Sequence, residues 1–241
     1  MSFVQTLTER LTFNWAEPAA EAVAERMERD GAHDVGHILR VLENARKIAD
    51  GERAAGRTVD WEVVAAAVLF HDAVNLPKDS PRRSEASAMA AELAVGFFRE
   101  RGTFGEGRLD LVRRAIERHS FSRGESPESL EARIVQEADR LEATGAVGLA
   151  RTFYVSATME GQISHPTDPF AEERERDDTA YAIDHFFEKL LLLKDGFQTE
   201  TGRRMADQRH EVLVGFLEQF SRETGVSLPE TSRYLSGQNT I

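Results

Sequence analysis

The stretch that decides the fold is DWEVVAAAVLFHD, residues 60–72. Its apolar run predicts an α-helix, because apolar residues from Val64 onward recur with His71 at the i, i+3, i+4 and i+7 positions of one helix face. Asp60 stands where a helix N-cap is expected. The helix should therefore carry His71, and Asp72 beside it, toward the protein interior. Buried polar side chains need partners, and a metal ion could bind both of them at once.

Helical periodicity dominates the rest of the chain, and no convincing run of alternating polar and apolar residues predicts a β-strand. The spacing predicts helices over residues 17–29, 38–49, 60–72, 84–101, 107–118, 128 onward, 183–191 and 213–220. Prolines, glycines and charged residues predict irregular connections at 75–81, 122–127 and 160–178, the last of which could form a flap over a site. We expect one all-α domain over residues 1–241, with the C-terminal helices from about residue 178 packed on it.

The composition is that of a soluble globular protein. Of the 241 residues, 41% are hydrophobic and 30% are charged. The net charge of −12 argues against a broad nucleic-acid surface and against binding to an anionic membrane. The chain has no cysteine, which excludes disulfide bonds and thiolate ligands. Because we find neither an apolar stretch long enough to span a bilayer nor a secretion signal, we expect a cytoplasmic protein.

Two further polar side chains lie near the apolar faces of other predicted helices. His37 begins the second predicted helix, and Asp139 borders the apolar stripe of the sixth. Together with His71 and Asp72 they make two imidazoles and two carboxylates, which suit a divalent first-row metal ion and leave positions for water and substrate. The negative end of the helix dipole at the His-Asp doublet also favours a cation. Taken singly, each residue has a structural alternative, such as a hydrogen-bonded core histidine or a salt bridge with a neighbouring arginine.

The order of these four residues resembles the metal-binding pattern of the HD-domain superfamily of metal-dependent phosphohydrolases. Members of that superfamily are all-helical and bind one divalent ion with a histidine, a His-Asp doublet and a later aspartate. Local stretches of the chain also resemble the family: HDVGHILRV (33–41), LFHD (69–72), HSFS (119–122), EADRLEATGA (137–146) and HFFEKL (185–190). The last three resemble one bacterial branch of predicted hydrolases. The resemblance therefore implies an HD-domain helical bundle with additional C-terminal helices.

The resemblance also implies an enzyme that holds one divalent metal ion through His37, His71, Asp72 and Asp139. The ion could be manganese, magnesium, iron, cobalt, nickel or zinc, with manganese favoured. We expect a metal-bound water to attack a nucleotide and to split a nucleoside triphosphate into a monophosphate and pyrophosphate. Asp72 is also the candidate acceptor of that water's proton. The alternatives are a phosphomonoesterase, a cyclic-nucleotide phosphodiesterase, or a non-catalytic module that binds a metal or a nucleotide, and the sequence indicates no oligomeric state.

Other polar residues are candidates for holding the phosphorylated substrate or for supporting the metal ligands. Phosphate binding needs cationic or N–H donors, and the candidate substrate-binding residues are Lys78, His119 and Arg140. His33 and Asp34 are candidate supports that would hold the first metal-binding histidine by hydrogen bonds. Structural alternatives remain: Lys78 could be a solvated loop charge, His119 could cap its own helix, and Asp34 could be an N-cap.

The remaining histidines are weaker candidates for a site. His185 lies in an apolar run and is expected to pack, whereas His210 lies between Arg209 and Glu211 and is expected at the surface. Because no second set of ligands stands out, we expect one metal ion rather than two.

Overall fold

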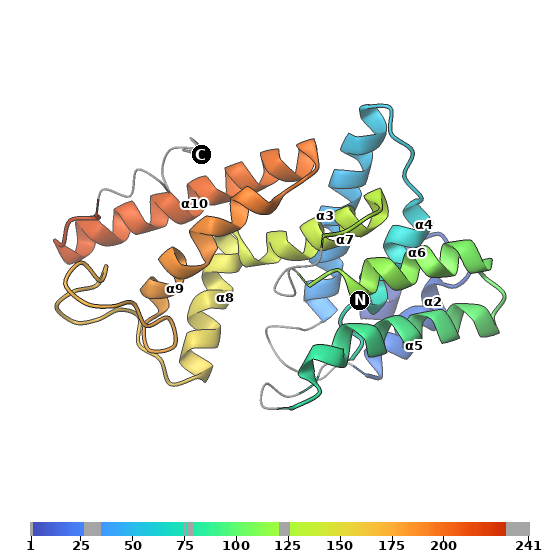
Figure 1. Ribbon diagram of the computed structural model, residues 1–241, viewed down its shortest axis with the longest axis horizontal. Coiled ribbons are helices and arrows are strands. Elements are labelled where there is room, and N and C mark those ends of the chain that lie inside the picture. The colour runs from blue at the N-terminus through green and yellow to red at the C-terminus, as the bar shows by residue number, and fades with distance from the viewer. Residues whose placement is uncertain (1, 27–34, 75, 77–79, 121–125, 230–241) are drawn as a thin grey trace. The chain divides into compact units, whose positions relative to one another are not determined.

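The structure is a computed structural model that describes residues 2–26, 35–74, 76, 80–120 and 126–229 (Figure 1). These residues form α-helices and short 3-10 helices, and among them the only β pairing is an isolated bridge between Gln162 and Tyr181. The all-α prediction is therefore confirmed. In the described part of the chain, no helix combines the length and the apolar character that crossing a membrane would require.

The chain divides into two compact units. The N-terminal unit comprises residues 1–140 and 198–202, and the C-terminal unit comprises 141–197 and 203–241. The first unit holds α1 (Phe3–Arg10), α2 (Ala16–Ala24), α3 (Val35–Ala54), α4 (Trp61–Phe70), η1 (Arg83–Glu85), α5 (Ala86–Glu100), α6 (Glu106–Glu117) and α7 (Leu130–Arg140). The second holds η3 (Leu141–Ala143), α8 (Gly145–Thr158), α9 (Ala182–Glu188), η4 (Leu190–Gly196) and all but the first residues of α10 (Glu200–Thr224). The single domain over residues 1–241 stays a prediction.

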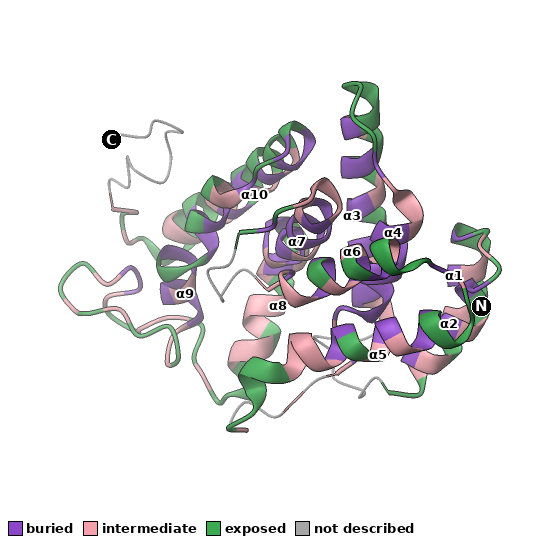
Figure 2. Ribbon diagram, turned by 45° about the vertical axis from the view of Figure 1, so that its right-hand side comes forward, coloured by how far each residue is buried: buried purple, intermediate pink, exposed green. Residues whose placement is uncertain are grey.

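The decisive stretch forms α4, and every residue from Val63 to Phe70 is buried (Figure 2). A helix that is apolar on all sides has to lie inside a bundle, and α4 packs against α3, α5, α6 and α7. The expected N-cap is confirmed, because the Asp60 carboxylate accepts a hydrogen bond from the backbone N–H of Val63 at 3.2 Å. This central position brings the residues that follow α4 close to helices from distant parts of the chain.

The helix expected from residue 128 onward is interrupted. α7 ends at Arg140, a 3-10 turn follows, and α8 begins at Gly145, whose φ of +64° is a conformation that favours glycine. Gly148 is equally constrained, because a Cβ there would lie 2.3 Å from the backbone carbonyl carbon of Ala143. Apolar residues continue across this break, so periodicity alone did not reveal it. We did not predict α1 from the sequence, although Ser2 and Gln5 form a capping box at its start.

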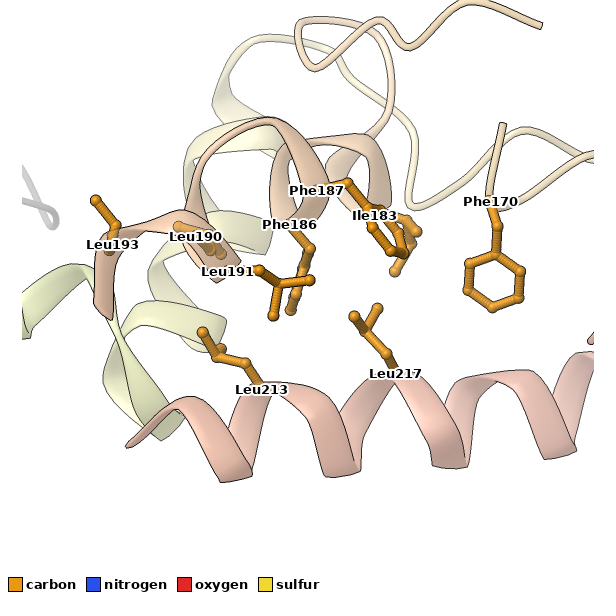
Figure 3. Close-up of a cluster of buried hydrophobic side chains, with 9 residues drawn as sticks. All are labelled: Phe170, Ile183, Phe186, Phe187, Leu190, Leu191, Leu193, Leu213 and Leu217. Carbon is orange, nitrogen blue, oxygen red and sulfur yellow. The ribbon is translucent and has the colours of Figure 1, made fainter. Parts of the chain in front are cut away.

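The two C-terminal helices expected from their apolar stripes are present and pack together (Figure 3). Their buried faces form one hydrophobic cluster with residues of the preceding connection. Its members are Phe170, Ile183, Phe186, Phe187, Leu190, Leu191, Leu193, Leu213 and Leu217. The C-terminal unit thus has an apolar core of its own.

Leu217→Ala tests the placement of α10. Leu217 is 2% exposed, and deleting its branched side chain should lower the free energy of unfolding by about 2–5 kcal/mol through lost transfer energy and a residual cavity. Val212→Ala on the same helix is the control, because Val212 is 44% exposed and should change stability little. Urea denaturation followed by circular dichroism measures both, and equal stabilities would contradict the observed packing.

Candidate metal centre

His71 is the residue at which α4 ends, and it is 1% exposed. Its Nδ1 lies 2.7 Å from the backbone oxygen of Val68. A carbonyl oxygen can only accept a hydrogen bond, so Nδ1 carries a proton, and in the neutral imidazole Nε2 is then the nitrogen with a lone pair. Histidines that bind metals are commonly held in this way, with one ring nitrogen donating to the protein and the other free to coordinate.

Four candidate ligands from three segments of the chain converge around His71 Nε2. His37 on α3 places its Nε2 3.2 Å from His71 Nε2, and Asp72 Oδ2 lies 3.5 Å from both nitrogens. Ligand atoms of these three residues all lie within 4.8 Å of one another and could hold a metal ion. Asp139 on α7 completes the group, with its Oδ1 3.4 Å from His37 Nε2 and 3.8 Å from His71 Nε2.

The spacing and chemistry of these atoms fit a divalent cation. Two atoms bound about 2.1 Å from an ion, at octahedral or tetrahedral angles, lie about 3.0–3.4 Å apart. The separations of 3.2–3.8 Å are close to that range. A neutral His71 would present its Nε2 lone pair toward the two carboxylates, and a cation between these groups would stabilise that arrangement. A set of two imidazoles and two carboxylates suits a first-row divalent metal.

The charges in this group favour anionic carboxylates. Burial by itself would raise the pKa of Asp72, but His71, His119 and His37 outweigh it and hold the pKa of this carboxyl well below its usual value. Burial likewise opposes ionisation of Asp139, and the contacts with His37 and His71 lower its pKa. The imidazoles of His37 and His71 are at most 1% exposed, whereas the carboxylates are 27% and 28% exposed. The group can therefore be reached from the carboxylate side.

His119 joins the group from the segment after α6. Its Nδ1 donates a hydrogen bond to the Ile116 carbonyl at 2.6 Å, and its Nε2 lies 3.6 Å from Asp72 Oδ1. The His119 side chain is almost buried, and its ring is 5.0 Å from that of His71. Burial would lower the pKa of His119, but Asp72 and Asp139 raise it above its ordinary value. Asp72 thus has one oxygen toward the other ligands and one toward His119.

His119→Ala is expected to weaken metal binding, because the Asp72 carboxylate would lose the group that orients its second oxygen. Residues that support ligands in this way typically contribute about 10–100-fold to metal affinity. Calorimetric titration of the apoprotein with Mn²⁺ measures the change. His185→Ala is the control, since His185 contacts Asp178 in the C-terminal unit. An unchanged dissociation constant for His119→Ala would contradict the orienting role.

The other predicted site residues have different outcomes. Arg140 is the last residue of α7, directly after Asp139, and is 7% exposed. Lys78, His33 and Asp34 lie outside the described residues. The roles of all four as substrate contacts or ligand supports remain predictions.

The surface placement expected for His210 is wrong. His210 is 7% exposed, although its sequence neighbours are charged. It lies on α10 three residues before Leu213 and seven before Leu217, so all three share the buried face of the helix. The charged neighbours Arg209 and Glu211 masked this periodicity.

Two buried polar residues near the ligands were missed by the sequence reasoning. Asn44 on α3 is 3% exposed, and its side-chain NH₂ donates to the Ala138 carbonyl at 3.1 Å. Glu137 on α7 is 1% exposed. Asn44 follows His37 by about two helical turns, so both residues lie on the same face of the helix. A polar residue on the apolar face that carries a candidate ligand was the signal available in the sequence.

Known proteins are similar to this chain in both sequence and fold. A family model described as HD domain matches residues 34–144. The uncharacterized protein YpgQ of Bacillus subtilis (strain 168) is 34% identical over 211 residues, covering 85% of this chain and 91% of YpgQ. The crystal structure of YpgQ in complex with ADP matches with a TM-score of 0.62 and 26% identity, over 96% of this chain and 100% of that one. An HD-superfamily hydrolase from Bacillus thuringiensis matches with a TM-score of 0.65 and 28% identity, over 88% and 98% of the two chains.

Proposed function

This chain belongs to the HD domain family, and on that premise we propose that it is a hydrolase that cleaves a phosphoanhydride or phosphoester bond of a nucleotide with one divalent metal ion. The observation that carries the proposal is the convergence of His37, His71, Asp72 and Asp139, in which the two imidazole nitrogens lie 3.2 Å apart and each carboxylate lies 3.4–3.8 Å from both of them. The likeness to an HD-superfamily hydrolase supports the reaction class.

The four converging residues would be the metal ligands, with Mn²⁺ the favoured ion. A divalent ion bound there would lower the pKa of water and neutralise charge on phosphoryl oxygens. Four protein ligands are fewer than an octahedral ion takes, so such a centre would keep positions for substrate and water.

The chain's own residues would divide the remaining work. Asp72 presents Oδ2 to the imidazoles and Oδ1 to His119, and its partly exposed carboxylate would accept the proton of an attacking water. His119, Lys78 and Arg140 are the candidate contacts to the phosphates. Nearly buried imidazole and guanidinium groups bind phosphate oxygens more strongly than solvated ones do, because less water competes for them.

A nucleotide is the proposed substrate class, because the related YpgQ has been crystallised in complex with ADP. Among nucleotides we propose nucleoside triphosphates, split to the monophosphate and pyrophosphate. This specific reaction extends beyond the likeness to YpgQ and needs its own test.

The test is a screen of the purified protein, first stripped of metal and then supplied with single divalent ions. Substrates are ribo- and deoxyribonucleoside triphosphates, ADP, a cyclic nucleotide and p-nitrophenyl phosphate, with products separated by ion chromatography. We expect pyrophosphate and monophosphate with Mn²⁺, and no turnover with EDTA. Turnover of p-nitrophenyl phosphate alone would replace the proposal with a phosphomonoesterase, and turnover of the cyclic nucleotide alone would replace it with a phosphodiesterase. Release of inorganic phosphate from the triphosphates would overturn the pyrophosphate-releasing reaction. Metal binding without turnover of any substrate would replace the proposal with a binding module.

A further inference from the structure

A short segment of the chain returns to the N-terminal unit late in the sequence. Residues 198–202 belong to that unit, although residues 141–197 before them and 203–241 after them belong to the C-terminal unit. We call residues 198–202 the clasp. It comprises Gln198, Thr199 and the first residues of α10.

Glu137 on α7 anchors the clasp through hydrogen bonds. Its carboxylate accepts the backbone N–H groups of Gln198 and Thr199, the latter at 2.8 Å, and also the Thr199 hydroxyl. The Thr199 oxygen in turn accepts the backbone N–H of Gly202 at 2.9 Å, a bond typical of a residue that caps a helix N-terminus. Glu137 and Thr199 are both buried, so breaking these bonds would leave polar groups unsatisfied away from water.

The clasp also packs against two helices that carry candidate ligands. A Cβ on Gly202 would lie 2.0 Å from Glu137 Oε2, and a Cβ on Gly51 of α3 would lie 2.0 Å from Thr201 Oγ1. Neither position has room for a larger residue unless the clasp moves. The clasp therefore touches α7, which carries Asp139, and α3, which carries His37.

The anchored turn is the one that presents a candidate ligand. Glu137 and Asp139 are two residues apart near the end of α7, and Asn44 of α3 holds the intervening Ala138 carbonyl at 3.1 Å. Because the turn is tied on both sides, a shift of Glu137 would move Asp139 as well. Well-formed metal sites keep their ligand distances within about 0.2 Å of the usual values, so a shift of this turn is expected to weaken coordination.

We propose that Thr199 and Glu137 are positioning residues that hold Asp139 where metal binding requires it. The inference rests on the proposed metal centre. If these two residues position Asp139, the metal affinity of the N-terminal unit depends on the clasp, which is covalently joined on both sides to the C-terminal unit. The hydrogen bonds of Glu137 with Gln198 and Thr199 join α7 to the clasp, so the effect acts through the position of α7.

Thr199→Val tests the inference, because valine keeps the branched shape and removes the hydroxyl. We expect the dissociation constant for Mn²⁺, measured by calorimetry on the full-length apoprotein, to rise about tenfold, the low end for residues that orient ligands. Thr199→Ser keeps the hydroxyl and is expected to bind Mn²⁺ as tightly as the wild type. If Thr199→Val does not fold, Thr199→Ala removes the same hydroxyl with a smaller side chain.

A stability control separates positioning from general loosening. Leu7→Ala removes a buried side chain from α1, a helix of the same unit that carries no candidate ligand. It should lower the melting temperature and leave the Mn²⁺ affinity unchanged. If Thr199→Val and Thr199→Ala bind Mn²⁺ as tightly as the wild type, the positioning role is wrong and the proposed function still stands. If the wild-type protein binds none of the divalent ions, the proposed function itself is wrong.

Discussion

Asp139→Ala is expected to lower kcat/KM by about a thousandfold, because loss of a ligand removes several kcal/mol of transition-state stabilisation by the metal and each 1.36 kcal/mol is worth a factor of ten. The side chain contacts both candidate imidazoles, at 3.4 and 3.8 Å. Steady-state assays with the nucleotide found in the screen measure the loss. Asp110→Ala is the matched control, since Asp110 lies on α6 of the same unit and pairs with Arg114 at the surface, where both side chains are about half exposed.

Metal binding provides an independent readout for Asp139→Ala. A ligand present at a hundred times its dissociation constant stabilises a folded protein by about 2.7 kcal/mol. We expect Mn²⁺ to raise the melting temperature of the wild type and of Asp110→Ala, but not that of Asp139→Ala. Elemental analysis after dialysis should find metal in the wild type and in Asp110→Ala, but not in Asp139→Ala. An Asp139 variant that retains both its metal and its turnover would remove Asp139 from the site.

Asp184→Ala is expected to destabilise the C-terminal unit by about 3–5 kcal/mol, the usual cost of breaking a buried ion pair. Asp184 is 1% exposed and accepts both Arg174 NH groups at 2.6 and 2.7 Å and the backbone N–H of Asp177 at 2.7 Å. Arg174 also lies over the Tyr181 ring, 4.6 Å from its centroid. Removing the carboxylate would leave a largely buried guanidinium without its counter-charge. Urea denaturation measures the loss.

The control for Asp184 is a nearby exposed pair. Glu188 is 48% exposed and lies 3.3 Å from Arg176, so Glu188→Ala should cost less than about 1 kcal/mol. If the two variants lost similar free energies of unfolding, the buried pair of Asp184 and Arg174 would not stabilise the C-terminal unit more than an exposed pair does. The irregular backbone predicted for residues 160–178 is confirmed. The ion pair between Arg174 and Asp184 holds this segment against α9. The action of this segment as a flap over a site stays a prediction.

The sequence by itself determined the helical character of this protein and the identity of the candidate ligands. A helix as uniformly apolar as α4 can only be buried, and Asp60 supplies its N-cap from the adjacent residue. The doublet His71-Asp72 follows directly, so its approach to the interior was also readable. These properties depend on residues within one or two helical turns of each other, which the linear order displays.

Only the tertiary structure decided which distant groups meet. The contact of His119 with Asp72 joins residues that follow two different helices, and the clasp brings Thr199 to Glu137 across 62 positions of the chain. The burial of His210 depended on which face of α10 packs, a choice that its charged neighbours concealed. Periodicity reports the apolar face of each helix but carries no information about the partner helix, the crossing point or the rotation, and those are set by the packing of side chains from the whole chain.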